Sequence, residues 1–408
     1  MKKKEKDIII IGGGAAGFFA AASSAENNPE NNVIILEKGN TVLSKVKISG
    51  GGRCNVTNAC ADPAVLIKYY PRGGKELLSP FYRFNSGNTI EWFERHGVKL
   101  KTEPDGRIFP VSDDSQTIVD CLNNTVQKAG IKVLKQNGVT NIQKDAKGDW
   151  IITTSEKEFH ADAIILCSGS SSSVWKMIES IGHTIEPPVP SLFTFIINDK
   201  RIKDISGISV KDTKIKIEGT ELKSSGPLLI THWGMSGPGI LKISAWGARE
   251  LHNIDYKFML NINWLPRMNR ESAKELLIKI KNSNLTRRIY SFSPFEIPLR
   301  LWERLLEYIN LDKDLKWNNV SQNLITNLVS ELTESCFNVS GKSTFKEEFV
   351  TCGGVRRSEI DFNNMESKLN KGLFFAGEVI DIDAVTGGFN FQAAWTTGWI
   401  AGISASAI

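Results

Sequence analysis

The sequence predicts an α/β protein in which helices flank a parallel sheet, a β-meander is added, and a second domain is inserted. Two observations predict the parallel sheet. The apolar run Ile8–Ile11 leads into a glycine-rich turn and a helix-forming stretch at 15–25. Near the other end, a second apolar run at 373–376 leads into another glycine turn and a last helix. Strands buried on both faces by crossover helices have such uninterrupted apolar runs.

The N-terminal turn has the spacing of a dinucleotide-binding fingerprint. Gly12, Gly14 and Gly17 form G-x-G-x-x-G, and a second apolar strand ends at Glu37. Gly12 permits the tight turn, Gly14 leaves room for a pyrophosphate, and Gly17 lets helix and strand pack closely. The helix N-terminus offers N–H groups to phosphates, and an acid about 20 residues later binds ribose hydroxyls. The acid favours FAD or NAD over NADP; the alternative is a glycine-rich turn in an ordinary α/β protein.

Composition bounds the class of protein. At 408 residues the chain is long enough for two or three domains. Lys and Arg number 50 against 45 Asp and Glu, and the net charge of +5 is too small to indicate nucleic acid. We find no secretory signal and no apolar run of membrane length. The six cysteines lack C-x-x-C and metal-ligand spacing, so we expect a cytoplasmic protein without a metal site.

Residues 44–58, SKVKISGGGRCNVTN, are predicted to form a loop whose backbone approaches a flat or charged ligand. Arg53 is suited to donating hydrogen bonds to phosphate or carbonyl oxygens, or alternatively forms a surface salt bridge. Cys54 is either a small packed residue or a reactive thiol. The loop's candidate ligand contacts are Gly51, Gly52, Arg53, Cys54 and Asn55.

The middle of the first domain is predicted to alternate helices with short strands. We expect helices over 64–97 and 114–128. A buried strand at Ala163–Cys167 ends in the small-residue turn Ser168-Gly169-Ser170, which suits a dinucleotide beside the first glycine turn. Four short strands with intervening turns predict a β-meander that crosses over from the parallel sheet. They are residues 131–134, 139–143, 150–154 and 158–160.

Pro187, Pro188 and Pro190 predict the start of an inserted substrate-side domain at 191–345. Its loop THWGMSGP contains His232, which is either a proton donor near pH 7 or a histidine held by backbone hydrogen bonds. The dinucleotide-binding domain would then comprise residues 1–190 and 346–408. Within the insert, we expect strands in 191–268 and 333–345 and helices in 269–332.

The chain returns to the first domain near Phe349, where FVTCGGV predicts another strand. The apolar strand at 373–376 is followed by Gly377, Glu378 and Asp381, and Gly387-Gly388 opens the last helix. An acid just past a strand can hold sugar hydroxyls, and a glycine turn into a helix presents N–H groups to a carbonyl edge. A bound flavin would use both groups, because its ribityl chain carries hydroxyls and its pyrimidine ring has a carbonyl edge. The two ends therefore predict one full-length FAD site; the alternative is an ordinary strand–turn–helix.

Six segments, in this order, resemble the BaiN/RdsA family of NAD(P)/FAD-dependent oxidoreductases, which also includes proteins called aminoacetone oxidases. They are GGGAAG, SGGGRCNVTN, DGRIFP, THWGMSGP, TCGGV and GLFFAGEVIDIDAVTGGFNFQAAWTTGWIAG. The resemblance spans nearly the whole chain, and SGGGRCN and the C-terminal block are its specific parts. It implies a flavoprotein of the two-dinucleotide-binding-domains type, with a Rossmann-type FAD-binding domain and an inserted β-barrel-like and helical region.

The resemblance also implies which residues surround FAD. By motif match they are Gly12, Gly14, Ala15, Ala16, Gly17, Glu37, Lys38, Gly52, Arg53, Cys54, Val139, Gly377, Glu378, Asp381, Gly388, Asn390 and Gln392. The reasoning from the residues adds Gly51, Asn55, Ser168, Gly169 and Gly387. There is one departure: where relatives usually carry Ala-Thr-Gly-Gly, this chain has Cys167-Ser168-Gly169-Ser170.

We therefore expect an FAD-dependent oxidoreductase that transfers hydride through flavin N5 to or from a small or medium organic substrate. NAD(P)H-driven reduction of a conjugated carbonyl is one possible reaction, and substrate-reduced amine oxidation with oxygen is the alternative. The insert has no second G-x-G-x-x-G, so NAD(P)H would bind only transiently. The candidates for catalysis are Arg53, Cys54 and His232, with no role fixed for any of them.

Two other classes of function stay open: a flavin-binding module of an RNA-modifying assembly, and a redox-inert FAD sensor. The first would need a basic, aromatic-lined face. Its sequence cue is the basic cluster Lys274, Lys279, Lys281, Arg287 and Arg288, for which a solvated helix face is the plainer interpretation. We therefore expect a small-molecule substrate and no nucleic acid; the oligomeric state is not predicted.

Overall fold

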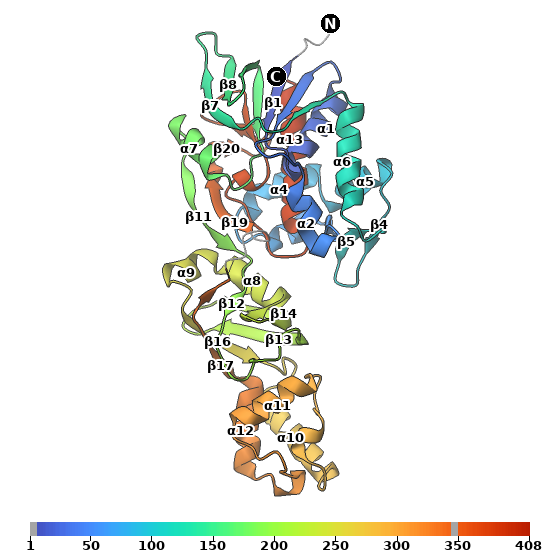
Figure 1. Ribbon diagram of the computed structural model, residues 1–408, viewed down its shortest axis with the longest axis vertical. Helices are drawn as coiled ribbons and strands as arrows, with labels where there is room; N and C mark the ends of the chain where they lie inside the picture. The colour runs from blue at the N-terminus through green and yellow to red at the C-terminus, as the bar shows by residue number, and fades with distance from the viewer. Residues whose placement is uncertain (1–5, 344–349) are drawn as a thin grey trace. The chain divides into compact units, whose positions relative to one another are not determined.

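The computed structural model describes residues 6–343 and 350–408. The chain divides into two compact units, residues 1–190 with 346–408 and residues 191–345 (Figure 1). The first unit contains both chain ends and the second is continuous in sequence. Phe349, where we expected the chain to return to the first domain, lies outside the described residues.

A seven-stranded, mostly parallel sheet forms the centre of the first unit, in the order β20-β21-β22-β10-β1-β2-β6. Strands β1, β2, β6, β10 and β22 run parallel, with Ile9 aligned to Ile34 on one side and Ile164 on the other. The strands are β1 (Asp7–Ile11), β2 (Asn32–Leu36), β6 (Lys132–Leu134), β10 (Ala163–Leu166), β20 (Ile360–Asp361), β21 (Glu366–Ser367) and β22 (Leu373–Phe375). The α/β class with a parallel sheet is thus confirmed.

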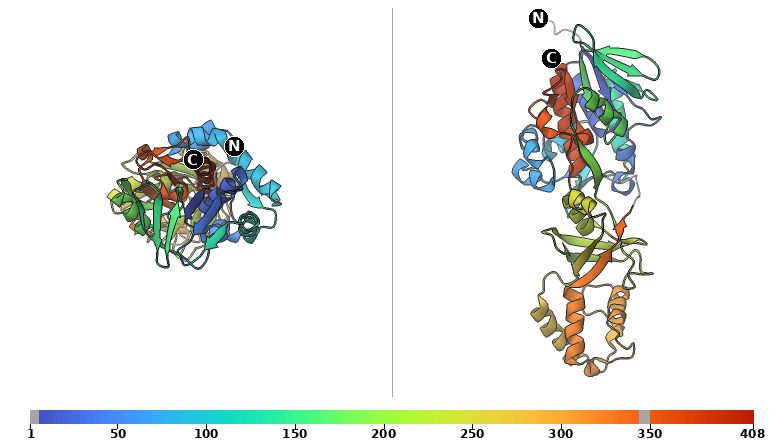
Figure 2. Two further views of the ribbon diagram at one scale, coloured as in Figure 1. Left: turned by 90° about the horizontal axis from the view of Figure 1, so that it is seen from above. Right: turned by 90° about the vertical axis from the view of Figure 1, so that its left-hand side faces the viewer.

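Helices α1 (Ala15–Asn27) and α13 (Phe389–Ser406) lie side by side, although they come from opposite ends of the chain (Figures 1 and 2). Two glycines make this contact close. A Cβ at Gly398 would come within 2.7 Å of the Ala16 carbonyl oxygen, and one at Gly402 within 2.3 Å of that of Ala20. Side chains with a β-carbon would therefore push the helices apart.

Smaller elements complete the first unit. The strands are β3 (Thr57–Asn58), β4 (Leu100–Thr102), β5 (Arg107–Pro110), β7 (Val139–Lys144), β8 (Trp150–Thr154), β9 (Glu158–Ala161), β11 (Ile185–Ser191) and β19 (Val350–Val355). The helices are α2 (Ser44–Gly52), α3 (Pro63–Leu66), α4 (Gly74–Arg83), α5 (Ser86–Arg95), α6 (Gln116–Lys128) and α7 (Ser172–Ser180), with 3-10 turns at Ile67–Tyr69, Arg357–Glu359 and Gly377–Val379.

The structure differs from three expectations for this unit. The first strand of the expected meander, β6, pairs with β2 in the parallel sheet, so the meander is only β7-β8-β9. The three prolines lie within β11, which pairs with β19 in a two-stranded sheet. Prolines are tolerated there because a strand with few partners needs few N–H donors. The expected loop at 44–58 begins as helix α2, which turns non-helical at Ser49–Gly51.

The second unit contains a seven-stranded antiparallel sheet in the order β17-β16-β13-β14-β15-β12-β18, and helices α10–α12 form its helical part (Figure 2). Helices α8 and α9 were not expected within the strand region. The strands are β12 (Phe195–Ile196), β13 (Ser209–Ile217), β14 (Lys223–Ile230), β15 (Gly234–Ser236), β16 (Phe258–Asn263), β17 (Ser335–Val339) and β18 (Gly341–Lys342). The helices are α8 (Pro238–Trp246), α9 (Ala248–Asn253), α10 (Arg270–Ser283), α11 (Leu299–Tyr308) and α12 (Gln322–Thr333), with 3-10 turns at Ile289–Ser291 and Trp317–Asn319.

Candidate functional site

The carboxyl ends of four parallel strands meet at one edge of the first unit's sheet. Gly12 follows β1, Glu37 follows β2, Ser168 comes two residues after β10, and Gly377 comes two residues after β22. Parallel strands end at the same edge, so these segments from distant parts of the sequence lie together. In open α/β sheets, ligands bind in the crevice outside this edge.

The three fingerprint glycines have different surroundings. Gly12 has φ +112°, and a Cβ there would lie 2.4 Å from the Cys167 carbonyl oxygen. A Cβ on Gly17 would lie 2.0 Å from the Gly12 carbonyl oxygen. At Gly14, in contrast, a Cβ would meet no atom within 4 Å. Gly12 and Gly17 are therefore required by the protein's own packing, whereas Gly14 faces open space.

That open space lies at the N-terminus of α1. Gly14 is the N-cap residue and its helix end has no side-chain cap, so the N–H groups of Ala15 and Ala16 at the start of the helix lack a capping side chain. First-turn N–H groups have no partner within a helix, and they favour an anion. A pyrophosphate over Gly14 would satisfy them.

Glu37 holds the fingerprint turn by hydrogen bonds. Its Oε2 accepts a hydrogen bond from Gly13 N–H at 2.8 Å, and its Oε1 accepts one from Gly39 N–H at 2.7 Å. An ionised carboxylate has about four lone-pair sites, so two sites stay open to ribose hydroxyls. Lys38 and the meander lie beside it, because a Cβ on Gly138 would come within 3.2 Å of Lys38 Cγ. Val139 therefore begins β7 close to the Glu37 end of the site.

Ser168 has a buried hydroxyl without a partner. Its Oγ has no hydrogen-bond partner among the described residues. An unpaired buried hydroxyl costs free energy, so such a group calls for a bound partner. The next residue, Gly169, lies beside the Glu378 carboxylate. A Cβ on Gly169 would lie 3.8 Å from Glu378 Oε2. The residues in this turn therefore fit a ligand that offers a hydrogen-bonding group between β10 and β22.

Glu378 connects the two halves of the site. Its Oε1 accepts a hydrogen bond from Thr351 N–H at 3.0 Å, and its Oε2 pairs with Lys45 Nζ at 2.5 Å. Lys45 belongs to α2, so this ion pair joins the N-terminal segment to the C-terminal segment. Sequence reasoning missed Lys45 because a lysine in a predicted loop carries no signal of which acid it will meet.

The turn before α13 is packed against β3. A Cβ on Gly388, whose φ is +90°, would lie 2.4 Å from the Thr57 carbonyl oxygen. The Asn55 amide, oriented so that both its polar atoms are paired, donates to Thr57 O at 3.0 Å and accepts from Gly388 N–H at 2.9 Å. Gly388 N–H therefore already donates a hydrogen bond to Asn55. The first-turn N–H groups of α13 that follow it lack a side-chain cap.

The side chains of two residues expected around FAD form hydrogen bonds within the protein. The Asn390 amide accepts from Ala384 N–H at 2.9 Å and donates to Ala384 O at 3.0 Å. Gln392 is fully buried, accepts from the Thr57 and Thr89 hydroxyls at 2.6 and 2.9 Å, and donates to Thr396. Both side chains hold the segments around the site, and the place of these residues beside FAD stays a prediction.

Other residues that we expected around FAD also contact neighbouring residues of the protein. Asp381 is buried, and its carboxylate lies 3.5 Å from Arg357 Nη1. Arg53 pairs with Glu103 at 2.7 Å and stacks on the Phe109 ring at 4.0 Å, which is the salt-bridge alternative for this residue. A Cβ on Gly387 would lie 2.8 Å from the Phe389 ring. Gly51 and Gly52, in contrast, face open space: no atom lies within 4 Å of a Cβ at either residue.

The catalytic candidates Cys54 and His232 lie in different environments. Cys54 is fully buried, and burial raises the pKa of its thiol to about 12, so the thiol stays protonated at neutral pH. This environment corresponds to the packed alternative for Cys54. His232 belongs to the second unit, where it is exposed and its Nε2 lies 3.2 Å from Ser206 Oγ. The contact to this ring comes from a hydroxyl, whereas one of the two alternatives for His232 was a ring held by backbone hydrogen bonds.

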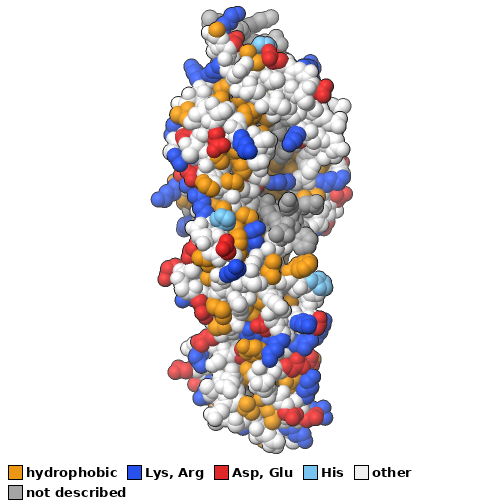
Figure 3. All heavy atoms as spheres, turned by 60° about the vertical axis from the view of Figure 1, so that its left-hand side comes forward, with side chains coloured by type: hydrophobic (Ala, Val, Ile, Leu, Met, Phe, Trp, Pro, Cys, Tyr) orange, Lys and Arg blue, Asp and Glu red, His pale blue; other side chains and the backbone are white. Residues whose placement is uncertain are grey.

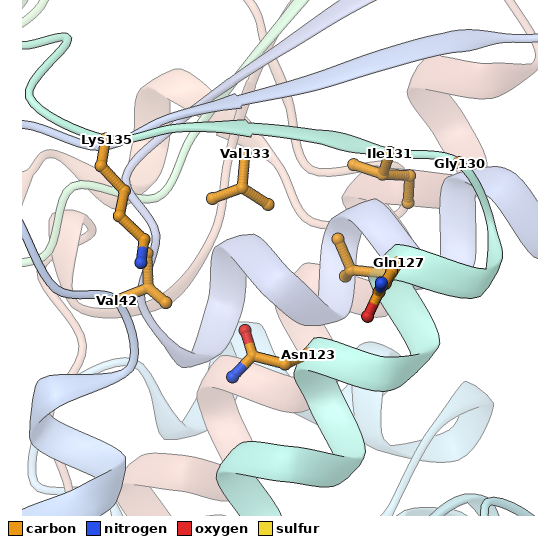
Figure 4. Close-up of a pocket in the computed structure, with 8 residues that line it drawn as sticks. Val42, Asn123, Gln127, Gly130, Ile131, Val133 and Lys135 are labelled. Atoms are coloured by element: carbon orange, nitrogen blue, oxygen red, sulfur yellow. The ribbon is translucent and has the colours of Figure 1, made fainter.

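A pocket of about 450 Å³ lies elsewhere in the first unit, between α6 and β6 (Figure 4). Asn123 and Gln127 project from α6. Its lining residues are Val42, Asn123, Val126, Gln127, Gly130, Ile131, Val133 and Lys135. None of these is an expected cofactor contact, and we assign the pocket no ligand.

Two features are absent from residues 6–343 and 350–408. No group of three or more His, Cys, Asp or Glu side chains in this part of the chain is placed to hold a metal ion. None of its helices is both long enough and apolar enough to cross a membrane.

Comparison with known proteins identifies the family. The family model described as HI0933-like protein Rossmann domain matches residues 6–404. A ribosomal RNA dihydrouridine synthase of Haemophilus influenzae is 30% identical over 386 residues, covering 91% of this chain and 92% of that protein. A 3-dehydro-bile acid delta(4,6)-reductase of Clostridium scindens is 28% identical over 386 residues, covering 91% and 92%.

Solved structures share the fold at low sequence identity. The 3-ketosteroid-delta4-(5alpha)-dehydrogenase of Rhodococcus jostii, solved with 4-androstene-3,17-dione, is 14% identical with a TM-score of 0.53, covering 100% of this chain and 98% of that one. An open flavocytochrome c3 fumarate reductase is 15% identical with a TM-score of 0.50, covering 99% and 78%. The chain therefore belongs to the HI0933-like Rossmann-domain family, the FAD-dependent oxidoreductases of the BaiN/RdsA type that its motifs resemble.

Proposed function

We propose that this protein is an FAD-dependent reductase of a carbon–carbon double bond conjugated with a carbonyl group. The observation that carries the proposal is the cradle at the carboxyl edge of the sheet. It combines open space over Gly14, the uncapped N-terminus of α1 and the unpaired Ser168 hydroxyl. These features fit a bound dinucleotide along the edge where β1, β2, β10 and β22 end.

The chain's own groups would hold FAD by charge and by shape. The N–H groups of Ala15 and Ala16 would bind the pyrophosphate, and Glu37 would accept hydrogen bonds from the ribose. Ser168 and Glu378 lie where β10 and β22 end, and would face the middle of the cofactor. First-turn N–H groups of α13 would stabilise negative charge on the reduced ring. Bound FAD would supply hydride transfer through its N5 atom.

The relatives' names support this class of substrate. A delta(4,6)-reductase acting on a 3-dehydro-bile acid reduces double bonds conjugated with a ketone. A dihydrouridine synthase adds two hydrogens across the C5–C6 bond of uracil, which is conjugated with the C4 carbonyl. Both names describe the same bond change on different substrates. We therefore place the double bond of an enone or a uracil beside the flavin, with NAD(P)H as the transient reductant.

One observation favours the RNA form of this function over our earlier expectation of no nucleic acid. Residues 191–345 contain 22 Lys and Arg against 16 Asp and Glu, a net charge of +6, whereas the rest of the chain carries 28 against 29. The modest charge of the whole chain thus conceals a basic second unit. A polyanionic substrate would be attracted to that unit.

Anaerobic stopped-flow of the purified yellow protein tests the proposal. NADH or NADPH should bleach the oxidised flavin band at about 450 nm, and a steroid enone or a uridine-containing RNA should then restore it. A protein that neither nucleotide bleaches, but that an amine reduces before reoxidation by oxygen, would instead be an amine oxidase. A protein that no reductant bleaches would be a redox-inert sensor.

A further inference from the structure

The second unit's sheet has one face covered and one face open. Along β13 the residues alternate: Thr213, Ile215 and Ile217 are buried, whereas Lys214 and Lys216 are exposed. Helix α8 packs against the buried side, since a Cβ on Gly239 would lie 2.8 Å from Ile215 Cδ1. Lys214 and Lys216 therefore point away from α8, toward solvent.

Neighbouring strands extend this exposed side. Lys216 is aligned with Lys223 on β14 and with Asn261 on β16. Lys214 is aligned with Ser225 and Asn263 in the same way. Residues directly opposite in an antiparallel pair share a face. We call this surface the lysine face, made of Lys214, Lys216, Lys223, Ser225, Asn261 and Asn263.

The lysines of the lysine face are not held in ion pairs. Its three lysines have no ion pair with any residue in the described part of the chain, and Lys216 faces Lys223 directly. Like charges directly opposite each other destabilise a sheet. Acids border the face as well. Asp212 lies 3.9 Å from Arg267 and Glu334 lies 3.0 Å from Arg270. Glu218 Oε1 accepts from the neutral Cys336 thiol at 3.3 Å, and Glu221 is exposed two residues before Lys223.

The basic cluster named from the sequence is different. Lys281 Nζ donates to the Val320 carbonyl oxygen at 2.6 Å, and Arg288 pairs with Asp314 at 3.1 Å. Lys274 and Lys279 are exposed on α10, on which Glu271 and Glu275 are exposed as well. Both signs of charge are also interspersed over the side of the molecule drawn in Figure 3. Arg287 is exposed and stacks on the Phe292 ring at 4.2 Å. Residues 269–332 carry 10 Lys and Arg against 8 Asp and Glu, so part of the positive charge lies in the helical part. The lysine face differs in that its three lysines lie on aligned positions and form no ion pair with the described residues.

We propose that the lysine face is the docking surface for the phosphate backbone of an RNA substrate. Lysines two residues apart on a strand are about 6.6 Å apart along it, so a row of them can contact successive phosphates. The face carries no aromatic ring on which a base could stack, so it contacts phosphates and does not select sequence. The proposal rests on the proposed function in its RNA form.

The test compares charge variants of the FAD-loaded, full-length protein. Lys214→Gln/Lys216→Gln removes two phosphate contacts, and Lys274→Gln/Lys279→Gln removes the same charge from α10. Binding of labelled 30-nucleotide oligouridylate is measured by fluorescence anisotropy at several salt concentrations. The slope of log K against log salt should fall by about 1.4 in the first variant, at about 0.7 per contact. Wild type should therefore lose about sevenfold more affinity than this variant between 50 and 200 mM salt.

Three further results decide the proposal. Lys214→Arg/Lys216→Arg keeps both positive charges and should bind RNA like wild type. Equal salt slopes in wild type and the Lys214/Lys216 glutamine variant, or an equal loss in the α10 variant, would overturn the docking surface. Reduction of the flavin by NAD(P)H should be unchanged in every variant. If NAD(P)H does not reduce the flavin of the wild-type protein, this would count against the proposed function, independently of the RNA result.

Discussion

Replacing Gly14 by valine should remove FAD and leave the fold intact. Gly14 has φ −93° and ψ −167°, an extended conformation that any residue adopts, and a Cβ there meets no atom within 4 Å. The valine side chain would instead occupy the place of the pyrophosphate. Loss of two charge-assisted hydrogen bonds, each about 1.5–3 kcal/mol, would weaken binding by about 3–6 kcal/mol. This corresponds to a factor of about 10² to 10⁴ in the dissociation constant.

The assay measures FAD bound per chain in the purified protein, titration of the apoprotein with FAD, and the urea midpoint of unfolding. Gly17→Ala is the matched control, because its Cβ would lie 2.0 Å from the Gly12 carbonyl oxygen and should destabilise the fold itself. A Gly14→Val protein that stays yellow with stoichiometric FAD would refute the position of the pyrophosphate. If Gly14→Val instead lowers the urea midpoint as Gly17→Ala is expected to do, the conclusion that Gly14 faces open space would be refuted.

Four further outcomes follow from the structure. Gly388→Ala would force a Cβ to 2.4 Å from the Thr57 carbonyl oxygen at φ +90°, so unfolding in urea should show a loss of about 1–3 kcal/mol. Gln392→Ala leaves the buried Thr57 hydroxyl without its acceptor, whereas Thr89 keeps the Asn85 carbonyl oxygen at 3.3 Å; it should cost about 1–3 kcal/mol of stability, yet folded protein should retain its full FAD content. Cys54, with a pKa of about 12, should resist iodoacetamide at pH 8 in the native protein, and mass spectrometry after unfolding should show it newly modified. Outside the site, His183 is buried, and its ring nitrogens lie 3.0 Å from Glu359 Oε2 and 2.9 Å from Ser367 Oγ. Burial lowers its pKa, so the unfolded chain binds the extra proton and wild-type stability should fall as pH drops below about 6.5, less steeply in His183→Gln; equal slopes would contradict this.

The sequence predicted the parts of the fold that depend on local pattern. The apolar run of β1, the turn Gly12–Gly17 and the acid Glu37 after β2 all obey spacing rules that act within about 30 residues. The α/β class followed from them, and the family followed from six motif segments, chiefly SGGGRCN and the C-terminal block; both are confirmed. What local pattern could not settle was pairing: β6 has only three residues, and its place beside β2 depends on a partner about 100 residues away.

Side-chain roles were harder to predict than backbone positions. Gln392 lies in a motif, but its helix face turns it toward Thr57 and Thr89, which no local pattern reveals. Arg53 was correctly placed in a glycine-rich segment, yet its partner Glu103 lies 50 residues away. Ser168 was named for the shape of its turn. Its unpaired buried hydroxyl could be recognised only in three dimensions.

The pairing of α1 with α13 has a consequence for how the protein is made. Synthesis delivers the N-terminus first, so α1 leaves the ribosome more than 360 residues before Gly398 and Gly402, which pack against it. Until then, the Ala16 and Ala20 side of α1 has no helix to cover it, and β22 has not yet joined the sheet. The proposed cofactor cradle thus closes only after α13 has been synthesised. Chains that stop before α13 would lack a closed cradle, so capture of FAD would distinguish them from chains that contain this helix.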